Sequence, residues 1–315
     1  MTSWMSSLPS LGEFFPPTPR AFSFNFNFFR LWPILSILQW TPLGKLQAMG
    51  KTSIASRFNL PGRLAWCLAE SVGPLNLLYI IYTLPAKIRP APQSSTSFLG
   101  TTLPMQCELL ACLYIIHYVN RAFIMPLFTA PSMSPIHPII AAAMALHQYL
   151  NSSNIGSWLV YSTLEGDFWD RTIFSFNAVC LTIVGLAMFN EGLWSNIQAE
   201  TTLHNLRRDA AKRRAKSEGK VEVTYDKVYV IPPPEGYFKN ILFPHYVWEW
   251  LEWTGYWILG GAWGLGWGYQ SPALWFVIVE IATMLPRAVR QLGWYEEKFG
   301  KRAIAGRAAV IPGYL

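Results

Sequence analysis

The chain has 315 residues, of which 52% are hydrophobic, 15% aromatic and 14% charged. A soluble domain usually carries roughly 25% charged residues, so this deficit argues against a soluble enzyme and favours an integral membrane protein. Much of the net charge of +7 lies in one segment, Arg207–Lys220, and no nucleic-acid-binding motif surrounds that segment. The charge therefore gives no support for a nucleic-acid partner.

The chain opens with a Pro- and Ser-rich segment, and we expect residues 1–22 to form a disordered tail. Residues 23–315 form a single domain with seven apolar stretches. The stretches cover residues 24–40, 64–84, 103–128, 139–159, 172–195, 246–267 and 272–287. Each is roughly 16–26 residues long, which suits a helix that crosses a bilayer with some tilt. The sequence predicts an all-α fold, a seven-transmembrane-helix bundle with an internal cavity.

The charges between the stretches indicate an orientation. Basic residues concentrate after the first and fifth stretches and in the carboxyl-terminal tail, whereas a small acidic loop at residues 165–170 lies on the opposite side. The positive-inside rule then places the amino terminus in the lumen and the carboxyl terminus in the cytosol. We expect Arg207–Lys220, with seven basic and two acidic residues, to be a solvated cytosolic loop. Contact of this loop with anionic membrane lipid or a nucleotide phosphate is the alternative.

The cysteines give no sign of a metal site. Cys67, Cys107, Cys112 and Cys180 lie in or beside apolar stretches, no two of them form a C-x-x-C pair, and histidines are scattered. We expect these cysteines to be small buried hydrophobic residues.

Ionisable and amide side chains lie inside the apolar stretches or at their cytosolic ends. A charge in hydrocarbon costs several kcal/mol unless it faces the bundle interior or a wet cavity, so such residues are functional candidates. The candidates are Glu70, Tyr118, Arg121, Asn196, Glu200, Arg207, His245, Glu249, Arg287 and Tyr295. An interhelical hydrogen bond is the ordinary explanation for any single polar residue, and we assign Glu108 and Glu280 to it.

Several candidates recur at helical spacing. Asn196, Glu200 and Arg207 follow one another by four and seven residues, so on a helix they share one narrow face. Arg287 and Tyr295, eight residues apart, also share a face. Repeated faces of this kind predict one polar cavity for a ligand with an anionic end.

Six motifs, taken in order, resemble those of the steroid 5α-reductase family. They are LPGRLAWCLAE (60–70), HYVNRAFIMPLF (117–128), NIQAETTLHNLR (196–207), YVIPPPEGYF (229–238), PHYVWEWLEWTGY (244–256) and RAVRQLGWYEEKFG with AVIP (287–312). Members of this family are seven-helix proteins of the endoplasmic reticulum that use NADPH to reduce a carbon–carbon double bond conjugated to a carbonyl. The resemblance implies the same location, cofactor and reaction here, with a lipophilic enone such as a 3-oxo-Δ4-steroid as substrate.

The resemblance also implies roles for the candidates. Glu70 and Tyr118 match the catalytic residues that hold the carbonyl oxygen, on which negative charge builds when hydride adds to the β-carbon. The tyrosine hydroxyl is a ready donor, and burial in an apolar span favours the protonated form of Glu70 that can donate. The cofactor-binding positions are matched by Arg121, Asn196, Glu200, Arg207, His245, Glu249, Arg287 and Tyr295.

Some residues depart from the family pattern. His245 stands where many members have Asn, Gln291 replaces a His, and His204 replaces an Arg. These changes bear on the substrate more than on the cofactor. Polyprenol reductases and long-chain trans-2-enoyl-CoA reductases share the fold and chemistry and remain alternatives. A membrane methyltransferase and a non-catalytic lipid-binding protein are alternatives of other classes; the first would need no enone-polarising pair, and the second would bind no nucleotide.

Overall fold

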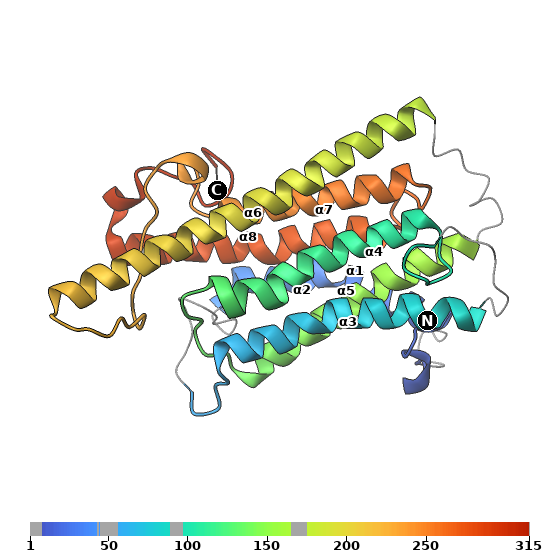
Figure 1. Ribbon diagram of the computed structural model, residues 1–315, viewed down its shortest axis with the longest axis horizontal. Helices are drawn as coiled ribbons and strands as arrows, with labels where there is room; N and C mark the ends of the chain where they lie inside the picture. Colours follow the sequence, from blue (N-terminus) through green and yellow to red (C-terminus); the bar gives the residue numbers. More distant parts are fainter. Residues whose placement is uncertain (1–7, 43, 45–55, 89–96, 165–174, 315) are drawn as a thin grey trace.

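The computed structural model describes residues 8–42, 44, 56–88, 97–164 and 175–314, and in these ranges the regular secondary structure is helical (Figure 1). The α-helices are α1 (Pro19–Arg30), α2 (Trp32–Ser36), α3 (Gly62–Ile88), α4 (Met105–Tyr118), α5 (Pro138–Tyr161), α6 (Phe176–Ser217), α7 (Pro244–Ala262) and α8 (Pro272–Phe299). A π-helix, η5 (Val119–Thr129), continues α4. Short 3-10 turns cover Leu11–Glu13, Ile37–Trp40, Ser162–Leu164, Gly236–Phe238 and Lys301–Ile304. The prediction of an all-α fold is confirmed.

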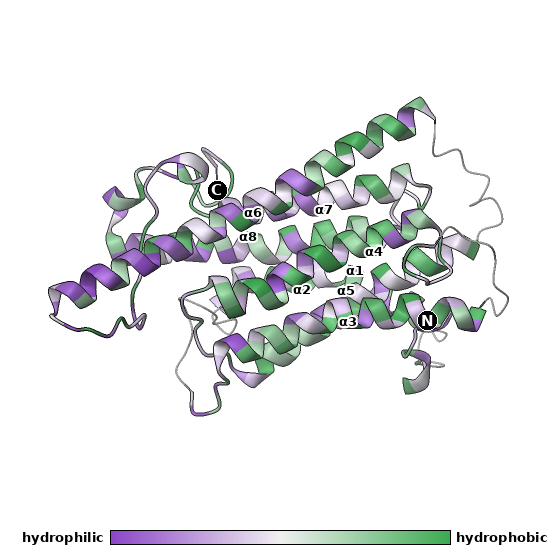
Figure 2. Cartoon of the chain, viewed as in Figure 1, coloured by the Kyte–Doolittle hydropathy of each residue, from purple (hydrophilic) through white to green (hydrophobic). Residues whose placement is uncertain are grey.

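Within the described ranges, four helical segments are long and apolar enough to cross a membrane. They are Gly62–Ile88, Met105–Thr129, Phe176–Ser217 and Pro272–Phe299. Polar residues interrupt the two other long helices: α5 contains Gln148 and residues 151–154, and α7 contains Glu249 and Glu252. Figure 2 shows the contrast along α6, whose first half is hydrophobic and whose last turns are hydrophilic. These helices indicate a membrane protein, while crossing by all seven stretches stays a prediction.

The first predicted stretch, residues 24–40, is not one helix. It is divided at Leu31 into α1 and α2, because Pro33 has no backbone N–H and its ring clashes with the carbonyl four residues earlier. Helical structure also begins earlier than expected. Helix α1 starts at Pro19, where the Thr18 hydroxyl accepts a hydrogen bond from the Ala21 N–H at 3.3 Å. Of the segment expected to be a disordered tail, residues 1–7 lie outside the described ranges.

The third predicted stretch, residues 103–128, changes helix type part-way. The α-helix ends at Tyr118 and the wider π-helix η5 continues to Thr129, with Pro126 inside it. Its carboxyl-terminal carbonyls are satisfied by Arg63 of α3, which donates to the carbonyls of Pro126, Leu127, Ala130 and Pro131 at 2.7–3.1 Å. π-Segments are frequent at functional sites. Tyr118 and Arg121, both candidates, lie at this junction.

The basic segment Arg207–Lys220, expected to be a loop, is helical as far as Ser217 and forms the last turns of the 42-residue helix α6. The helix persists beyond the bundle because the returning chain supports it. Arg214 donates to the carbonyls of Thr224 and Asp226 at 3.0 and 2.9 Å. The expected loop is therefore a helix with a following turn.

A large aromatic core fills the space between α4, α7 and α8. Trp253 lies at its centre and contacts the rings of Tyr114, Tyr118 and Phe276 with centroids 4.5–6.2 Å apart. Because they are buried in this core, the side chains beside the candidate site, such as Tyr118, are held in fixed positions. Cys107 belongs to this core, but Cys180 is exposed on α6, so the expectation of uniformly buried cysteines is wrong for that residue. An apolar thiol on a membrane-crossing helix can face lipid without cost.

Helices α6 and α7 approach one another closely through glycines. A methyl group on Gly192 would lie 2.5 Å from the backbone nitrogen of Glu252, and one on Gly255 would lie 2.6 Å from the carbonyl oxygen of Gly185. Small residues of this kind let membrane helices pack backbone against backbone. The close approach places Asn196 of α6 within hydrogen-bonding distance of Glu249 on α7.

We predict that Gly192→Ala lowers stability, because the new methyl group must push α6 away from α7, at a cost of about 1–3 kcal/mol. Thermal unfolding of the purified protein in detergent measures the effect. Gly293→Ala on α8 is the control, since nothing lies within 4 Å of its added methyl group. The control should be neutral or stabilising by about 0.5–1 kcal/mol. An equal response of the two variants would contradict the packing account.

Candidate functional site

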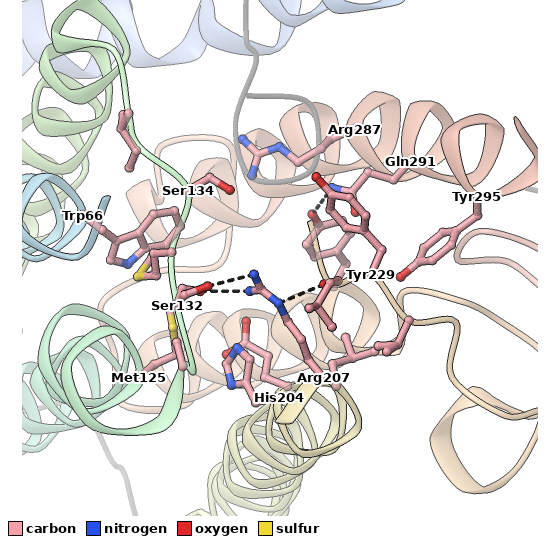
Figure 3. Close-up of a pocket in the computed structure, with 18 residues that line it drawn as sticks. Trp66, Met125, Ser132, Ser134, His204, Arg207, Tyr229, Arg287, Gln291 and Tyr295 are labelled. Carbon is pink, nitrogen blue, oxygen red and sulfur yellow. Dashed lines mark hydrogen bonds between the residues drawn. The ribbon is translucent and has the colours of Figure 1, made fainter. Parts of the chain in front are cut away.

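Two neighbouring cavities contain most of the candidate residues. The Glu70 cavity, of about 280 Å³, is lined by Trp32, Gln39, Trp66, Glu70, Tyr118, Arg121, Ile139, Ile140, Ala143, Met144, His147, Gln148, Glu249, Glu280, Thr283, Met284 and Arg287. The Arg207 cavity, of about 320 Å³, is lined by residues that include Glu200, His204, Arg207, Tyr229, Tyr246, Gln291 and Tyr295 (Figure 3). Trp66 and Arg287 line both cavities. Ligands in the two cavities would therefore lie next to one another at these two side chains.

Glu70 and Tyr118 lie in the Glu70 cavity with other polar side chains holding them in place. Glu70 is 4% exposed, and its Oε2 accepts a hydrogen bond from the Gln148 Nε2 at 2.7 Å. The Tyr118 hydroxyl oxygen accepts from the Asn151 Nδ2 at 3.4 Å. Because that oxygen already accepts a bond from the protein, its own hydrogen is available to donate into the cavity.

Arg121 joins two buried carboxylates that come from different helices. Its Nε lies 3.6 Å from the Glu70 Oε2, and its Nη1 lies 3.4 Å from the Glu249 Oε2. The Asn196 amide donates to the same Glu249 oxygen at 3.3 Å and to the His245 carbonyl at 3.1 Å. One connected network thus links α3, η5, α7 and α6. Within it, Arg121 pairs with two carboxyl groups and also lines the Glu70 cavity.

Two further buried residues, His117 and Glu252, contact this network. His117 Nδ1 lies 2.8 Å from the Glu252 Oε1, and His117 Nε2 lies 3.8 Å from the Glu249 Oε1. All three side chains are buried. The sequence analysis gave neither His117 nor Glu252 a role in the site. Only their positions in the sequence could have indicated them. His117 directly precedes Tyr118, and Glu252 follows Glu249 by one helical turn.

Arg207 connects two loops across the second cavity (Figure 3). It donates to the carbonyl and hydroxyl of Ser132 at 3.0 and 2.8 Å, to the Tyr225 carbonyl at 3.0 Å and to the Val228 carbonyl at 3.1 Å. Four of its five N–H donors are therefore used within the protein. Its neighbour Arg208 donates to the Thr129 carbonyl. Most of the hydrogen-bonding capacity of Arg207 maintains the cavity wall.

Arg287 differs from the other two candidate arginines. Within the described part of the chain, its guanidinium makes no hydrogen bond or ion pair, and it lies where the two cavities meet. Its neighbour on the same face of α8, Gln291, donates to the Tyr246 hydroxyl at 3.3 Å. Figure 3 shows Arg287, Gln291 and Tyr295 in a row along α8. A cation without a protein partner beside a cavity is suited to an anionic ligand group.

The structure separates the expected cofactor positions into three groups. Glu200, Arg207, Arg287 and Tyr295 line the Arg207 cavity. Arg121 and Glu249 line the Glu70 cavity with Arg287. Asn196 and His245 line neither of these two cavities, and the side-chain amide of Asn196 bonds inside the protein.

Several further residues of the Glu70 cavity were not selected from the sequence, among them Trp66, Gln148, His147 and Glu280. Trp66 lies four residues before Glu70 and so shares its helix face, which was a usable signal. Glu280 was assigned to an interhelical hydrogen bond, but its carboxylate makes none within the described ranges, and that assignment is wrong. Glu108 is satisfied by the preceding loop, through the hydroxyls of Ser97 and Thr101 and three backbone N–H groups.

Comparison with known sequences supports the same picture. A profile of the 3-oxo-5-alpha-steroid 4-dehydrogenase family matches residues 133–315. The chain belongs to that family. The 3-oxo-5-alpha-steroid 4-dehydrogenases are oxidoreductases, and the matched region holds α5–α8 with Glu200, Arg207, Glu249 and Arg287.

Several known proteins match a large part of the chain. Uncharacterized protein C9.08c of Schizosaccharomyces pombe is 30% identical over 271 residues, which are 86% of this chain and 90% of that protein. Steroid 5-alpha-reductase DET2 of Solanum lycopersicum is 29% identical over 65% of this chain and 68% of its own length. Rat 3-oxo-5-alpha-steroid 4-dehydrogenase 1 is 25% identical over 76% of this chain and 75% of its own length.

We predict that Arg207→Lys and Arg207→Ala perturb the protein alike. Lysine keeps the charge but cannot donate to Ser132, Tyr225 and Val228 at once. Amide hydrogen exchange in the segments 131–134 and 225–228 should rise strongly in both variants. If Arg207→Lys keeps wild-type protection, the charge matters more than the bonds to the loops, and the account of Arg207 as a loop connector is wrong.

Proposed function

We propose that this protein is an NADPH-dependent reductase that saturates the carbon–carbon double bond of a lipophilic enone, with a 3-oxo-Δ4-steroid as the substrate. The proposal rests on membership of the 3-oxo-5-alpha-steroid 4-dehydrogenase family and on one structural observation. The cavity that contains Glu70 and Tyr118 shares Trp66 and Arg287 with the cavity that contains Glu200 and Arg207. A substrate in the first and a dinucleotide in the second would meet at the shared wall.

The chemistry assigned to the Glu70 cavity is polarisation of a carbonyl. The Tyr118 hydroxyl and a protonated Glu70 would both donate to the enone oxygen, whose negative charge increases as the β-carbon is reduced. The Gln148 and Asn151 amides hold these two donors by hydrogen bonds. Removal of one such donor typically lowers turnover by a factor of about 10²–10³.

The Arg207 cavity has residues that suit a phosphorylated dinucleotide. Arg287 offers a guanidinium without a protein partner among the described residues, while Glu200, Gln291 and Tyr295 offer hydrogen-bonding groups around it. When bound, NADPH would supply the hydride to the β-carbon. Arg207 would contribute by holding the two loops of the wall, and the remaining N–H of its guanidinium is free to contact the ligand.

The location follows the family. We propose a multi-pass protein of the endoplasmic-reticulum membrane, with the amino terminus in the lumen and the carboxyl terminus in the cytosol. The extended basic end of α6 supports the cytosolic assignment, because Lys212, Arg213 and Lys216 are exposed there. Seven crossings are part of the proposal: the four apolar helices, α5 and α7, which run beside them (Figure 1), and the segment that contains α1 and α2.

The purified protein in detergent should oxidise NADPH in the presence of a 3-oxo-4-ene steroid. Glu70→Gln and Tyr118→Phe should each lower kcat by about 10²-fold or more, because the first replaces an acidic O–H donor with a weaker amide donor and the second removes a donor to the developing oxyanion. NADPH affinity, measured by fluorescence titration, should change little. Wild-type rates in both variants would show that the two residues take no part in the reaction. Polyprenols and long-chain trans-2-enoyl-CoA in the same assay test the alternative substrates.

Arg287→Ala should weaken NADPH binding by about tenfold or more, because a charge-assisted hydrogen bond to a phosphate or amide is lost. Arg302→Ala is the control, since Arg302 is exposed in the last 3-10 turn and lines neither cavity. The dissociation constant from fluorescence titration measures both. Equal affinities for the wild type and Arg287→Ala would exclude Arg287 from the cofactor site.

A further inference from the structure

Glu280 is a buried carboxyl that the proposed reaction does not use. It lies on α8 two helical turns before Arg287, is 8% exposed and lines the Glu70 cavity. Within the described residues its carboxylate makes no hydrogen bond and no ion pair. A buried carboxylate without a donor is costly, so an arrangement of this kind needs a partner from elsewhere.

The other carboxyls of the cluster each have a protein partner. Glu70 accepts from Gln148, Glu249 is bonded by Asn196, and Glu252 pairs with His117. Glu280 is thus the exception among the acidic side chains described here around the cavity. Glu280 and Thr283 both lie on α8, which forms one wall of the cavity. The Thr283 hydroxyl already donates to the Val279 carbonyl at 2.8 Å, so it does not donate to the Glu280 carboxylate.

A second polar atom without a partner comes from the α5 wall. His147 lines the same cavity, and its Nε2 is buried with no hydrogen bond within the described chain. The His147 ring lies 6.5 Å from the ring of Phe276, which precedes Glu280 by one turn of α8. The two groups therefore come from different helices that line the same cavity.

A hydroxyl group matches this pair, since it can donate to a carboxylate and accept from an imidazole N–H. We propose that Glu280 and His147 bind a hydroxyl of the substrate, in addition to the carbonyl contact at Glu70 and Tyr118. The substrate class is then a hydroxylated lipophilic ketone rather than a chain with a single polar end. The carbonyl part of this inference rests on the proposed function, whereas the hydroxyl contact does not.

The experiment compares ligands that differ by one hydroxyl. A panel of monohydroxylated saturated 3-oxo steroids is titrated against the parent ketone, and binding is followed through tryptophan fluorescence, since Trp32 and Trp66 line the cavity. At least one hydroxylated ketone should bind about tenfold or more tightly than its parent, as expected for a hydrogen bond to a charged group. No preference at any position would overturn the proposal.

Two substitutions of Glu280 locate the effect. Glu280→Leu should bring the hydroxylated ketone and its parent to equal affinity, while Glu280→Gln, which keeps an acceptor oxygen, should retain part of the preference. Thr283→Val is the matched control on the same wall and should keep the wild-type ratio, because the Thr283 hydroxyl bonds its own backbone. A preference that survives in Glu280→Leu would also overturn the proposal.

Folding and catalysis are checked separately. Glu280→Leu removes no bond to the described protein, so its melting temperature should equal or exceed that of the wild type. Binding of saturated ketones requires no turnover, so a protein that discriminates between them but oxidises no NADPH would contradict the proposed reduction and leave the hydroxyl site standing. If Glu280→Gln and Glu280→Leu abolish turnover equally and leave the ratio of affinities unchanged, Glu280 donates a proton instead, and the hydroxyl site is wrong.

Discussion

The position of Arg121 between Glu70 and Glu249 is the constraint on which the site depends. Two carboxyls are buried among helices, and one guanidinium lies 3.6 and 3.4 Å from them. A buried charge without a counter-ion is strongly destabilising, so α3, η5 and α7 must keep this arrangement for the bundle to be stable. Asn196 extends the constraint to α6, and Gln148 extends it to α5. The interaction that holds the helices together also fixes Glu70 in its cavity.

Three arginines of the site perform different tasks, and their partners decide which. Arg121 lies between two buried carboxyl groups, Arg207 ties two loops by four hydrogen bonds, and Arg287 makes no hydrogen bond or ion pair within the described residues. The resemblance to the family motifs predicted that all three arginines bind the cofactor. Only the geometry distinguishes the one that can offer its full charge to a ligand from the two whose donors are largely engaged.

Helical periodicity and hydropathy predicted much of the fold. The stretches 64–84 and 139–159 correspond to α3 and α5, with ends that differ by one to four residues. The errors have local causes that hydropathy does not register. Pro33 breaks the first stretch, η5 changes the helix type after Tyr118, and side-chain bonds to a returning loop keep the basic end of α6 helical.

The site was predictable where residues repeat on one helix face, and not where contacts cross between helices. Glu200 and Arg207, and likewise Arg287 and Tyr295, line the same cavity as their spacing indicates. The inward position of Glu280 could not be predicted, because an acid in an apolar stretch gives no sign of whether a neighbouring helix supplies its donor. The same holds for the pairing of His117 with Glu252, which are 135 residues apart.

The most direct test is an experimental structure of the protein with NADP⁺ and a non-reducible enone analogue bound together. The account predicts the nicotinamide at the wall formed by Trp66 and Arg287, and the ketone oxygen within hydrogen-bonding distance of Tyr118 and Glu70. A nicotinamide bound away from that wall, or a ketone oxygen that contacts neither side chain, would contradict it.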